Sequence, residues 1–115
     1  MAFSETEIEA IEKTLMHFLE VNRPPEEMRN KLDLTYKIEG QSVFIMEIRP
    51  RWDKPEEVIS IPIVKTSYIK SKDMWKIFWM RGTLKWEHYE PIPYVKNLSD
   101  VLDVVKQDSY GCFFG

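Results

Sequence analysis

Apolar residues recur at helical spacing near both ends of the chain. The stripe near the N-terminus predicts an amphipathic helix over about residues 5–21, formed by Ile8, Ile11, Leu15, Phe18 and Leu19. Ser4 and Glu7 form the capping-box pattern that begins such a helix, and Pro24-Pro25 ends it. A second stripe predicts a helix over about residues 98–107, with Asn97 as its N-cap and a buried side of Leu98, Val101, Leu102 and Val105.

Between these helices the pattern changes to the alternation that is typical of β-strands. Residues 32–38 alternate apolar and polar side chains, which predicts a half-buried strand that turns at Gly40. The returning segment, residues 42–48, is apolar on both faces and predicts a central strand. Alternation resumes at Ile59, but its phase changes near Pro62, so we expect a β-bulge or a break there.

A β-hairpin is predicted from residues 74–80 and 84–89, joined at Gly82-Thr83. A two-residue type II′ turn fits this pair because glycine tolerates positive φ at its first position. In that register Trp79 faces Trp86, and Ile77 faces His88. One side of the hairpin then carries Trp75, Ile77, Trp79, Leu84 and Trp86, and the other Lys76, Phe78, Met80, Lys85, Glu87 and Tyr89. A three-residue loop would instead bring Phe78 beside Trp86.

These elements predict a single α+β domain spanning residues 1–115. Its order is α-β-β-β-β-β-α, with an antiparallel sheet of about five strands and the two helices packed on one face. The content of 43% hydrophobic and 30% charged residues is typical of a globular protein. With one cysteine and two histidines in the chain, we expect no disulfide framework, no metal site and no cofactor. The acidic N-terminus and the lack of a long apolar run predict a cytoplasmic protein with neither a signal peptide nor a membrane span.

Three separate segments carry a resemblance to a known family. QSVFIMEIRPRWD, MWKIFWMRGTLKWEHYEP and the terminal CFFG occur in the order found in a small bacterial family catalogued as Domain of Unknown Function 3024. The resemblance covers essentially the whole chain and implies a compact single-domain protein without an assigned activity. The polar and aromatic positions that look like family signatures are Glu47, Arg49, Arg51, Trp52, Lys65, Arg81, Lys85 and Tyr89.

Enzymatic motifs give one candidate only. The four glycines are scattered singly, so no phosphate-binding loop is present, and no nucleophile elbow or zinc-binding helix occurs. Glu47-x-Arg49 at a strand end, with Asp33 on the preceding strand, resembles the acidic pair and lysine of metal-dependent nucleases. Arginine replaces the lysine and cannot give up a proton, so we expect Glu47 to pair with a basic neighbour such as Arg49. A divergent metal-dependent nuclease therefore remains an alternative, ranked below the two binding functions described next.

The expected function is that of a non-enzymatic binding module. Residues 64–89 hold six lysines and arginines against two acids, whereas the whole chain has a formal net charge of −3. An open sheet face and the turn after Arg49 are predicted to contact the partner through Arg49, Arg51, Trp52, Lys65, Lys76, Phe78, Arg81, Lys85 and Tyr89. A protein partner or a second copy of the chain is preferred because an acidic chain repels phosphate. Single-stranded nucleic acid is the alternative, since aromatic and cationic side chains are interleaved.

Overall fold

The structure is a computed structural model that describes residues 3–80 and 85–108. It is an α+β fold with the predicted order of elements and one additional short strand. The elements are α1 (Glu5–Asn22), η1 (Glu26–Met28), β1 (Asp33–Glu39), β2 (Ser42–Pro50), β3 (Val58–Ile69), β4 (Met74–Met80), β5 (Trp86–His88), β6 (Tyr94–Val95) and α2 (Leu98–Gln107). Within the described residues no helix is long and apolar enough to cross a membrane.

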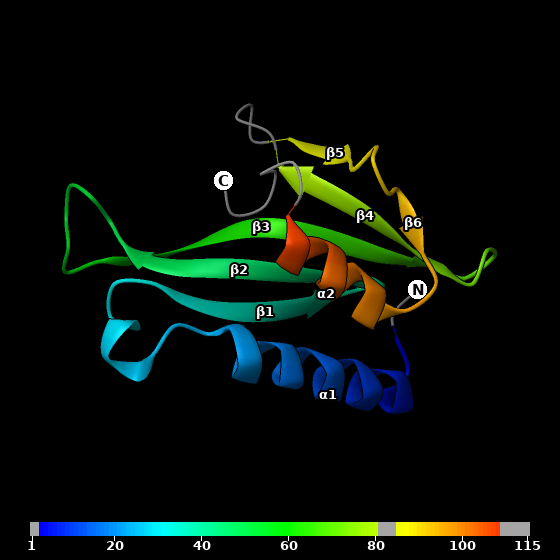
Figure 1. Ribbon diagram of the computed structural model, residues 1–115, viewed down its shortest axis with the longest axis horizontal. Helices are drawn as coiled ribbons and strands as arrows, with labels where there is room; N and C mark the ends of the chain where they lie inside the picture. Colours follow the sequence, from blue (N-terminus) through cyan, green and yellow to red (C-terminus); the bar gives the residue numbers. More distant parts are fainter. Residues whose placement is uncertain (1–2, 81–84, 109–115) are drawn as a thin grey trace.

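The strands form one antiparallel sheet in the order β1-β2-β3-β4-β5, with β6 paired to β4 beyond the end of β5. Both helices lie on the same side of this sheet, α1 along β1 and α2 across the middle (Figure 1). The central position predicted for β2 is confirmed, since β1 and β3 flank it. The opposite side of the sheet has no helix over it in the described part of the chain.

Hydrogen bonds from residues close in sequence define where both helices begin. The Ser4 side chain accepts the Glu7 N–H at 3.2 Å, and the Glu7 carboxylate accepts the Ser4 N–H at 2.8 Å, which completes the capping box. At α2 the Asn97 N–H donates to the Asp100 carboxylate at 3.1 Å. The predicted helices, stripes and N-caps are therefore confirmed, and the stripe of α2 is buried along its whole length.

A β-bulge interrupts the pairing of β2 with β3. Ile45 pairs with Val64, but its neighbour Met46 pairs with Pro62, so Ile63 is the extra residue. Both Ile63 and Val64 are buried, although consecutive strand residues ordinarily point to opposite faces. The predicted irregularity near Pro62 is confirmed, and it bends the sheet next to the site described below.

The predicted register of the hairpin between β4 and β5 is wrong by one residue. Phe78 pairs with His88 and Met80 with Trp86, whereas the expected partners of Trp86 and His88 were Trp79 and Ile77. Because a one-residue shift turns a strand over, Trp86 leaves the core side and Tyr89 enters it. Tyr89 is only 1% exposed and its N–H donates to the Ile77 carbonyl at 2.9 Å.

Filling of the core accounts for this register. Tyr89 is the largest of the fully buried side chains, and the observed pairing places its ring beside Ile77, where the predicted pairing placed the smaller ring of His88. Trp75 is buried as expected, and Trp79 is half-buried against the same cluster. The proposed turn at Gly82-Thr83 lies outside the described residues, and so does the C-terminal segment with Cys112.

Candidate binding face on the open side of the sheet

Cations and rings alternate across the open side of the sheet. In register, Lys37, Phe44, Lys65, Phe78 and His88 form a row that crosses β1, β2, β3, β4 and β5. Directly paired residues of antiparallel strands project from the same face, so these five side chains share one surface. A neighbouring row adds Lys76 of β4 and Tyr94 of β6, which are paired with each other. We call this surface the lysine–aromatic face: Lys37, Phe44, Lys65, Lys72, Lys76, Phe78, Trp86, His88 and Tyr94.

The lysine ammonium groups of this face lie over its rings. Lys65 Nζ is 5.1 Å from the ring centroid of Phe78 and 5.9 Å from that of Phe44. Lys76 Nζ is 5.2 Å from the Phe78 centroid and 5.9 Å from the Tyr94 centroid, and Lys72 Nζ is 4.5 Å from the latter. Each ammonium is therefore within reach of the negative ring face, where cation–π attraction acts.

The face is concave. The rings of Phe44 on β2 and Trp86 on β5 have centroids only 5.9 Å apart, although two strands lie between them in the sheet. One of these two strands, β3, carries the bulge, and a bulge bends the strand in which it occurs. Phe44 and Trp86 line a hollow of about 140 Å³ together with Lys37, Glu39, Met46 and Pro62.

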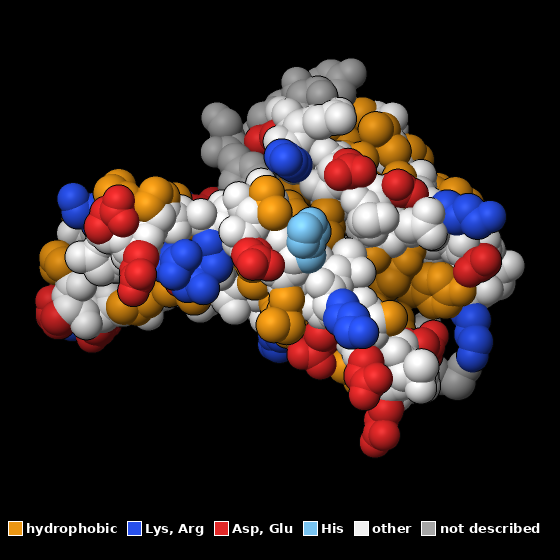
Figure 2. Space-filling model, turned by 60° about the horizontal axis from the view of Figure 1, so that its bottom comes forward, with side chains coloured by type: hydrophobic (Ala, Val, Ile, Leu, Met, Phe, Trp, Pro, Cys, Tyr) orange, Lys and Arg blue, Asp and Glu red, His pale blue; other side chains and the backbone are white. Residues whose placement is uncertain are grey.

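Charge is distributed unequally between the two sides of the molecule. Lys65, Lys72 and Lys76 have no ion-pair partner among the described residues, whereas Lys37 pairs with Glu39 at 3.0 Å. On the other side α1 alone carries five glutamates and one lysine. With α1 turned toward the viewer, Figure 2 shows acidic and basic side chains interspersed rather than separated. Within the described residues, the acidic protein thus presents on its open side a local patch of lysines without ion-pair partners.

The structure brings together only part of the predicted contact set. Lys65, Lys76 and Phe78 share the open face as expected, and exposed Lys85 comes just before β5. Tyr89 is buried in the core and is removed from the set, while Arg81 lies outside the described residues. The prediction missed Lys37, Phe44, Lys72, Trp86, His88 and Tyr94. The shifted hairpin register hid Trp86 and His88, and Phe44 could have been found from its place on a strand that is apolar on both faces.

Arg51 and Trp52 occupy a separate place, the tip of the β2–β3 hairpin. The Arg51 guanidinium binds Asp53 at 2.8 Å and Glu57 at 2.7 Å, and the Arg51 N–H donates to the Glu57 carbonyl at 2.9 Å. These bonds close the loop tightly around its arginine. Trp52 is 94% exposed at the end of the loop, far more than the other large hydrophobic side chains of the described residues.

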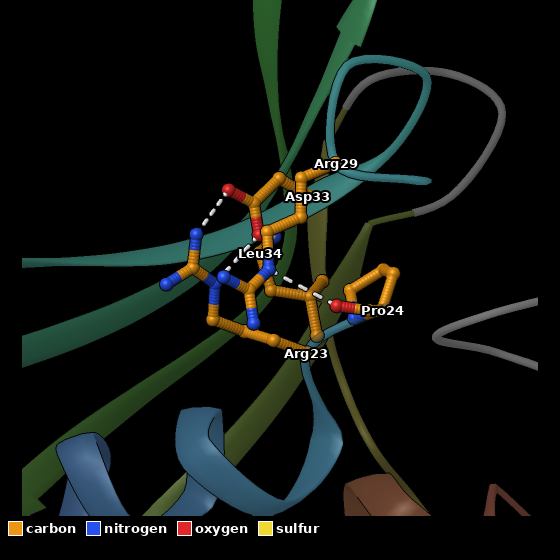
Figure 3. Close-up of polar contacts among 5 residues, drawn as sticks. All are labelled: Arg23, Pro24, Arg29, Asp33 and Leu34. Carbon is orange, nitrogen blue, oxygen red and sulfur yellow. Dashed lines mark hydrogen bonds and ion pairs between the residues drawn. The ribbon is translucent and has the colours of Figure 1, made fainter. Parts of the chain in front are cut away.

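Asp33 and Glu47, the acidic pair of the nuclease hypothesis, lie on opposite faces of the sheet. Glu47 pairs with Leu34, the neighbour of Asp33, and is buried on the helix side, where it forms the expected ion pair with Arg49. Asp33 is held instead by Arg23, whose two nitrogens donate to its carboxylate at 2.8 and 2.6 Å (Figure 3). This pair of hydrogen bonds from a guanidinium lowers the pKa of the Asp33 carboxyl. The two carboxylates therefore do not converge on one metal position, and no group of three metal-ligating side chains occurs in residues 3–80 and 85–108.

The sequence profile of the family described as a domain of unknown function (DUF3024) matches residues 3–115. The chain belongs to this family. No curated protein and no solved structure matches the chain.

Proposed function

We propose that the protein binds single-stranded nucleic acid on the lysine–aromatic face. The observation that carries this proposal is the row of alternating cations and rings from Lys37 to Phe78 on the uncovered side of the sheet. Proteins that bind single strands without strong sequence preference combine ring platforms for the bases with cations for the backbone. A concave face with both groups in alternation meets these two requirements.

Base stacking is stronger than the cation–π contacts that it would replace on the rings of this face. Lys65 and Lys76 cover the Phe78 ring in the free protein, and an exposed cation–π contact contributes only about 0.5–1 kcal/mol. A base stacked on an aromatic side chain contributes about 1–3 kcal/mol. A base can therefore displace an ammonium from the ring, and the released lysine is then beside the phosphates of the same strand.

The composition of the face favours nucleic acid over a protein partner. Lysine is depleted in protein–protein interfaces, whereas arginine and aromatic residues are enriched there. The cations of this face among the described residues are all lysines. The net charge of −3 is a weaker objection than the sequence implied, because the glutamates of α1 lie on the other side of the sheet.

Fluorescence anisotropy with labelled oligothymidylate and oligouridylate, at a series of salt concentrations, tests this proposal. We expect affinity to fall steeply with salt, and Lys65→Gln or Lys76→Gln each to flatten the logarithmic slope by roughly 0.7. Phe78→Ala should weaken binding by about 1–3 kcal/mol at every salt concentration. Lys13→Gln, which changes an exposed side chain of α1 on the other side of the sheet, is the matched control and should leave the slope unchanged. Absence of binding at low salt would end the nucleic-acid proposal.

A protein partner or a second copy of the chain is the second candidate, and the tip of the β2–β3 hairpin favours it. Tryptophan and arginine are enriched among the residues that dominate binding energy at protein interfaces. Trp52 stands almost fully exposed on a loop that Arg51 holds in shape. Sedimentation of the wild type and of Trp52→Ser over a concentration series tests self-association. A monomer at all concentrations for both proteins would remove the self-association version.

A further inference from the structure

A second hollow lies on the helix side of the sheet, where α1 and α2 both end. This helix-end cavity has a volume of about 360 Å³ and is lined by Phe18, Asn22, Pro24, Leu32, Leu34, Glu47, Arg49 and Lys106. Its floor is the cross-strand pair Leu34–Glu47 of β1 and β2. Its size is at the lower end of the range for small-molecule pockets, about 300–1,000 Å³.

Glu47 is an unexpected residue for its position. It continues the buried row of Val43 and Ile45 on β2 and is only 8% exposed. A buried carboxylate is costly unless it is paired, and an apolar side chain would fill this place at lower cost. Its partner is Arg49, two residues later on the same face of the strand. Glu47 thus fixes the position of a guanidinium at the cavity wall, which packing alone does not require.

The polar groups of the cavity have unused bonding capacity. One nitrogen of Arg49 donates to Glu47, and the arginine side chain remains 47% exposed. Lys106, in the last turn of α2, has no ion-pair partner among the described residues. Asn22 donates its amide N–H to the Phe18 carbonyl at 2.8 Å, which leaves its amide oxygen as an acceptor.

The balance of charge selects the class of ligand. Arg49 and Lys106 against Glu47 leave one net positive charge in the cavity. The negative ends of the two helix dipoles lie nearby; Arg23, at the end of α1, is paired with Asp33, and Lys106, in the last turn of α2, is one of the two cations already counted. A monoanion matches one positive charge, whereas a doubly charged phosphate exceeds it. The planar fork of arginine also suits a carboxylate.

Apolar side chains complete the cavity, and its rim is held in place. Phe18, Leu32 and Leu34 present hydrocarbon beside the charged groups. Arg23, at the end of α1, binds Asp33 at the start of β1, and Arg29 donates to the Pro24 carbonyl at 3.0 Å (Figure 3). These bonds join the segment after α1 to the sheet, so the wall containing Pro24 is supported from both sides.

We infer that the helix-end cavity binds a small monocarboxylic acid with an apolar body. Arg49 and Lys106 bind the carboxylate, Glu47 positions Arg49, and the apolar body packs against Phe18, Leu32 and Leu34. This site is on the opposite side of the sheet from the lysine–aromatic face and does not depend on it.

The inference is tested by titrating the labelled protein with the straight-chain series from acetate to octanoate and following backbone amide shifts by NMR. We expect affinity to rise with chain length, and the largest shifts to fall at Asn22, Leu34 and Glu47. Hexanamide, which is uncharged, should bind at least about tenfold more weakly than hexanoate, because a charge-assisted hydrogen bond is lost.

Two variants separate binding from folding. Arg49→Gln and Lys106→Gln should each weaken hexanoate binding roughly tenfold or more. Lys106→Gln changes an exposed side chain and should leave the amide spectrum elsewhere unchanged, whereas Arg49→Gln also removes the ion-pair partner of buried Glu47 and should lower stability. Lys13→Gln, on the far part of α1, is the control and should bind as the wild type does. The inference is overturned if hexanamide binds as well as hexanoate, if Arg49→Gln binds normally, or if the shifts fall in another part of the molecule.

Discussion

The two faces of the sheet use alternate residues of the same strands, yet they are covered in different ways. On the helix side Val43, Ile45, Val64 and Ile77 are at most 2% exposed beneath α1 and α2. On the open side lysine side chains lie over the rings of Phe44 and Phe78, and most residues of the lysine–aromatic face are half-buried. Lysine stems thus shield apolar surface while their charged ends remain in water. The helix side therefore supplies stability, and the open side keeps groups that a ligand can reach.

The largest expected effect separates two adjacent residues that belong to different faces. Tyr89→Ala should lower the free energy of unfolding by roughly 3–5 kcal/mol, because it leaves a cavity where a large ring is fully buried. His88→Ala is the matched control and should change it by no more than about 1.5 kcal/mol, since His88 is exposed and loses a contact with the Phe78 ring rather than a place in the core. Chemical denaturation measures both values. Similar losses for the two variants would mean that the faces of β5 are assigned the wrong way round.

The next effect concerns the ion pair that joins the end of α1 to β1. Arg23→Gln removes both guanidinium bonds to Asp33 and should cost about 1–3 kcal/mol. We expect the lower part of this range, because the Arg23 side chain is 34% exposed and solvent screens the pair. The measurement is the free energy of unfolding at neutral pH, with Arg29→Gln as a comparison that leaves Asp33 bound.

The same pair predicts the direction of a pH dependence. Hydrogen bonds from Arg23 lower the pKa of the Asp33 carboxyl in the folded protein, so the charged form is favoured by folding. This contribution is present above the ordinary pKa of aspartate, about 4, and is lost as the pH falls through the lowered folded value. Acid titration of stability should therefore be less steep below pH ~4 for Asp33→Asn than for the wild type. An identical acid limb for both proteins would contradict the assignment.

A smaller effect tests the curvature of the open face. Phe44 and Trp86 should show a coupling energy of about 0.5–1.5 kcal/mol in a double-mutant cycle with alanine, as expected for a pair of touching rings. The cycle between Trp79 and Trp86, the pair expected from the sequence, should give a coupling within about 0.5 kcal/mol of zero. A strong Trp79–Trp86 coupling would restore the predicted hairpin register and remove the concave face.

The elements whose position was predictable from sequence are those with local determinants. The capping box at Ser4 and the N-cap at Asn97 define the helix starts by contacts within one turn, and both are found where expected. The phase change near Pro62 likewise revealed the bulge. The hairpin register was not predictable from Gly82 alone, because the need to bury Tyr89 against residues distant in sequence decides it.

The candidate sites were predictable only in part for the same reason. Lys65, Lys76 and Phe78 belong to adjacent strands and were grouped correctly. Phe44 joins them through the pairing of β2 with β3, and Lys106 lines the same cavity as Glu47 only because α2 ends over that part of the sheet. Residues that are brought together in this way depend on tertiary packing, and a single sequence contains no local signal for it.

The smallest expected effect on stability gives the sharpest separation of the two faces. Lys65→Gln removes the ammonium from above Phe44 and Phe78, and it should lower the free energy of unfolding by only about 0.5–1 kcal/mol. The same change should nevertheless alter oligonucleotide binding, because a lysine beside the rings contributes to phosphate neutralisation. Val64, its neighbour on β3, should behave in the opposite way: Val64→Ala opens a cavity in the core and lowers stability more than Lys65→Gln does, without changing the salt dependence of binding. Denaturation and anisotropy on the same two variants decide the matter. If Val64→Ala changes the salt slope, or if Lys65→Gln is the more destabilising of the two, the division of labour between the faces is wrong.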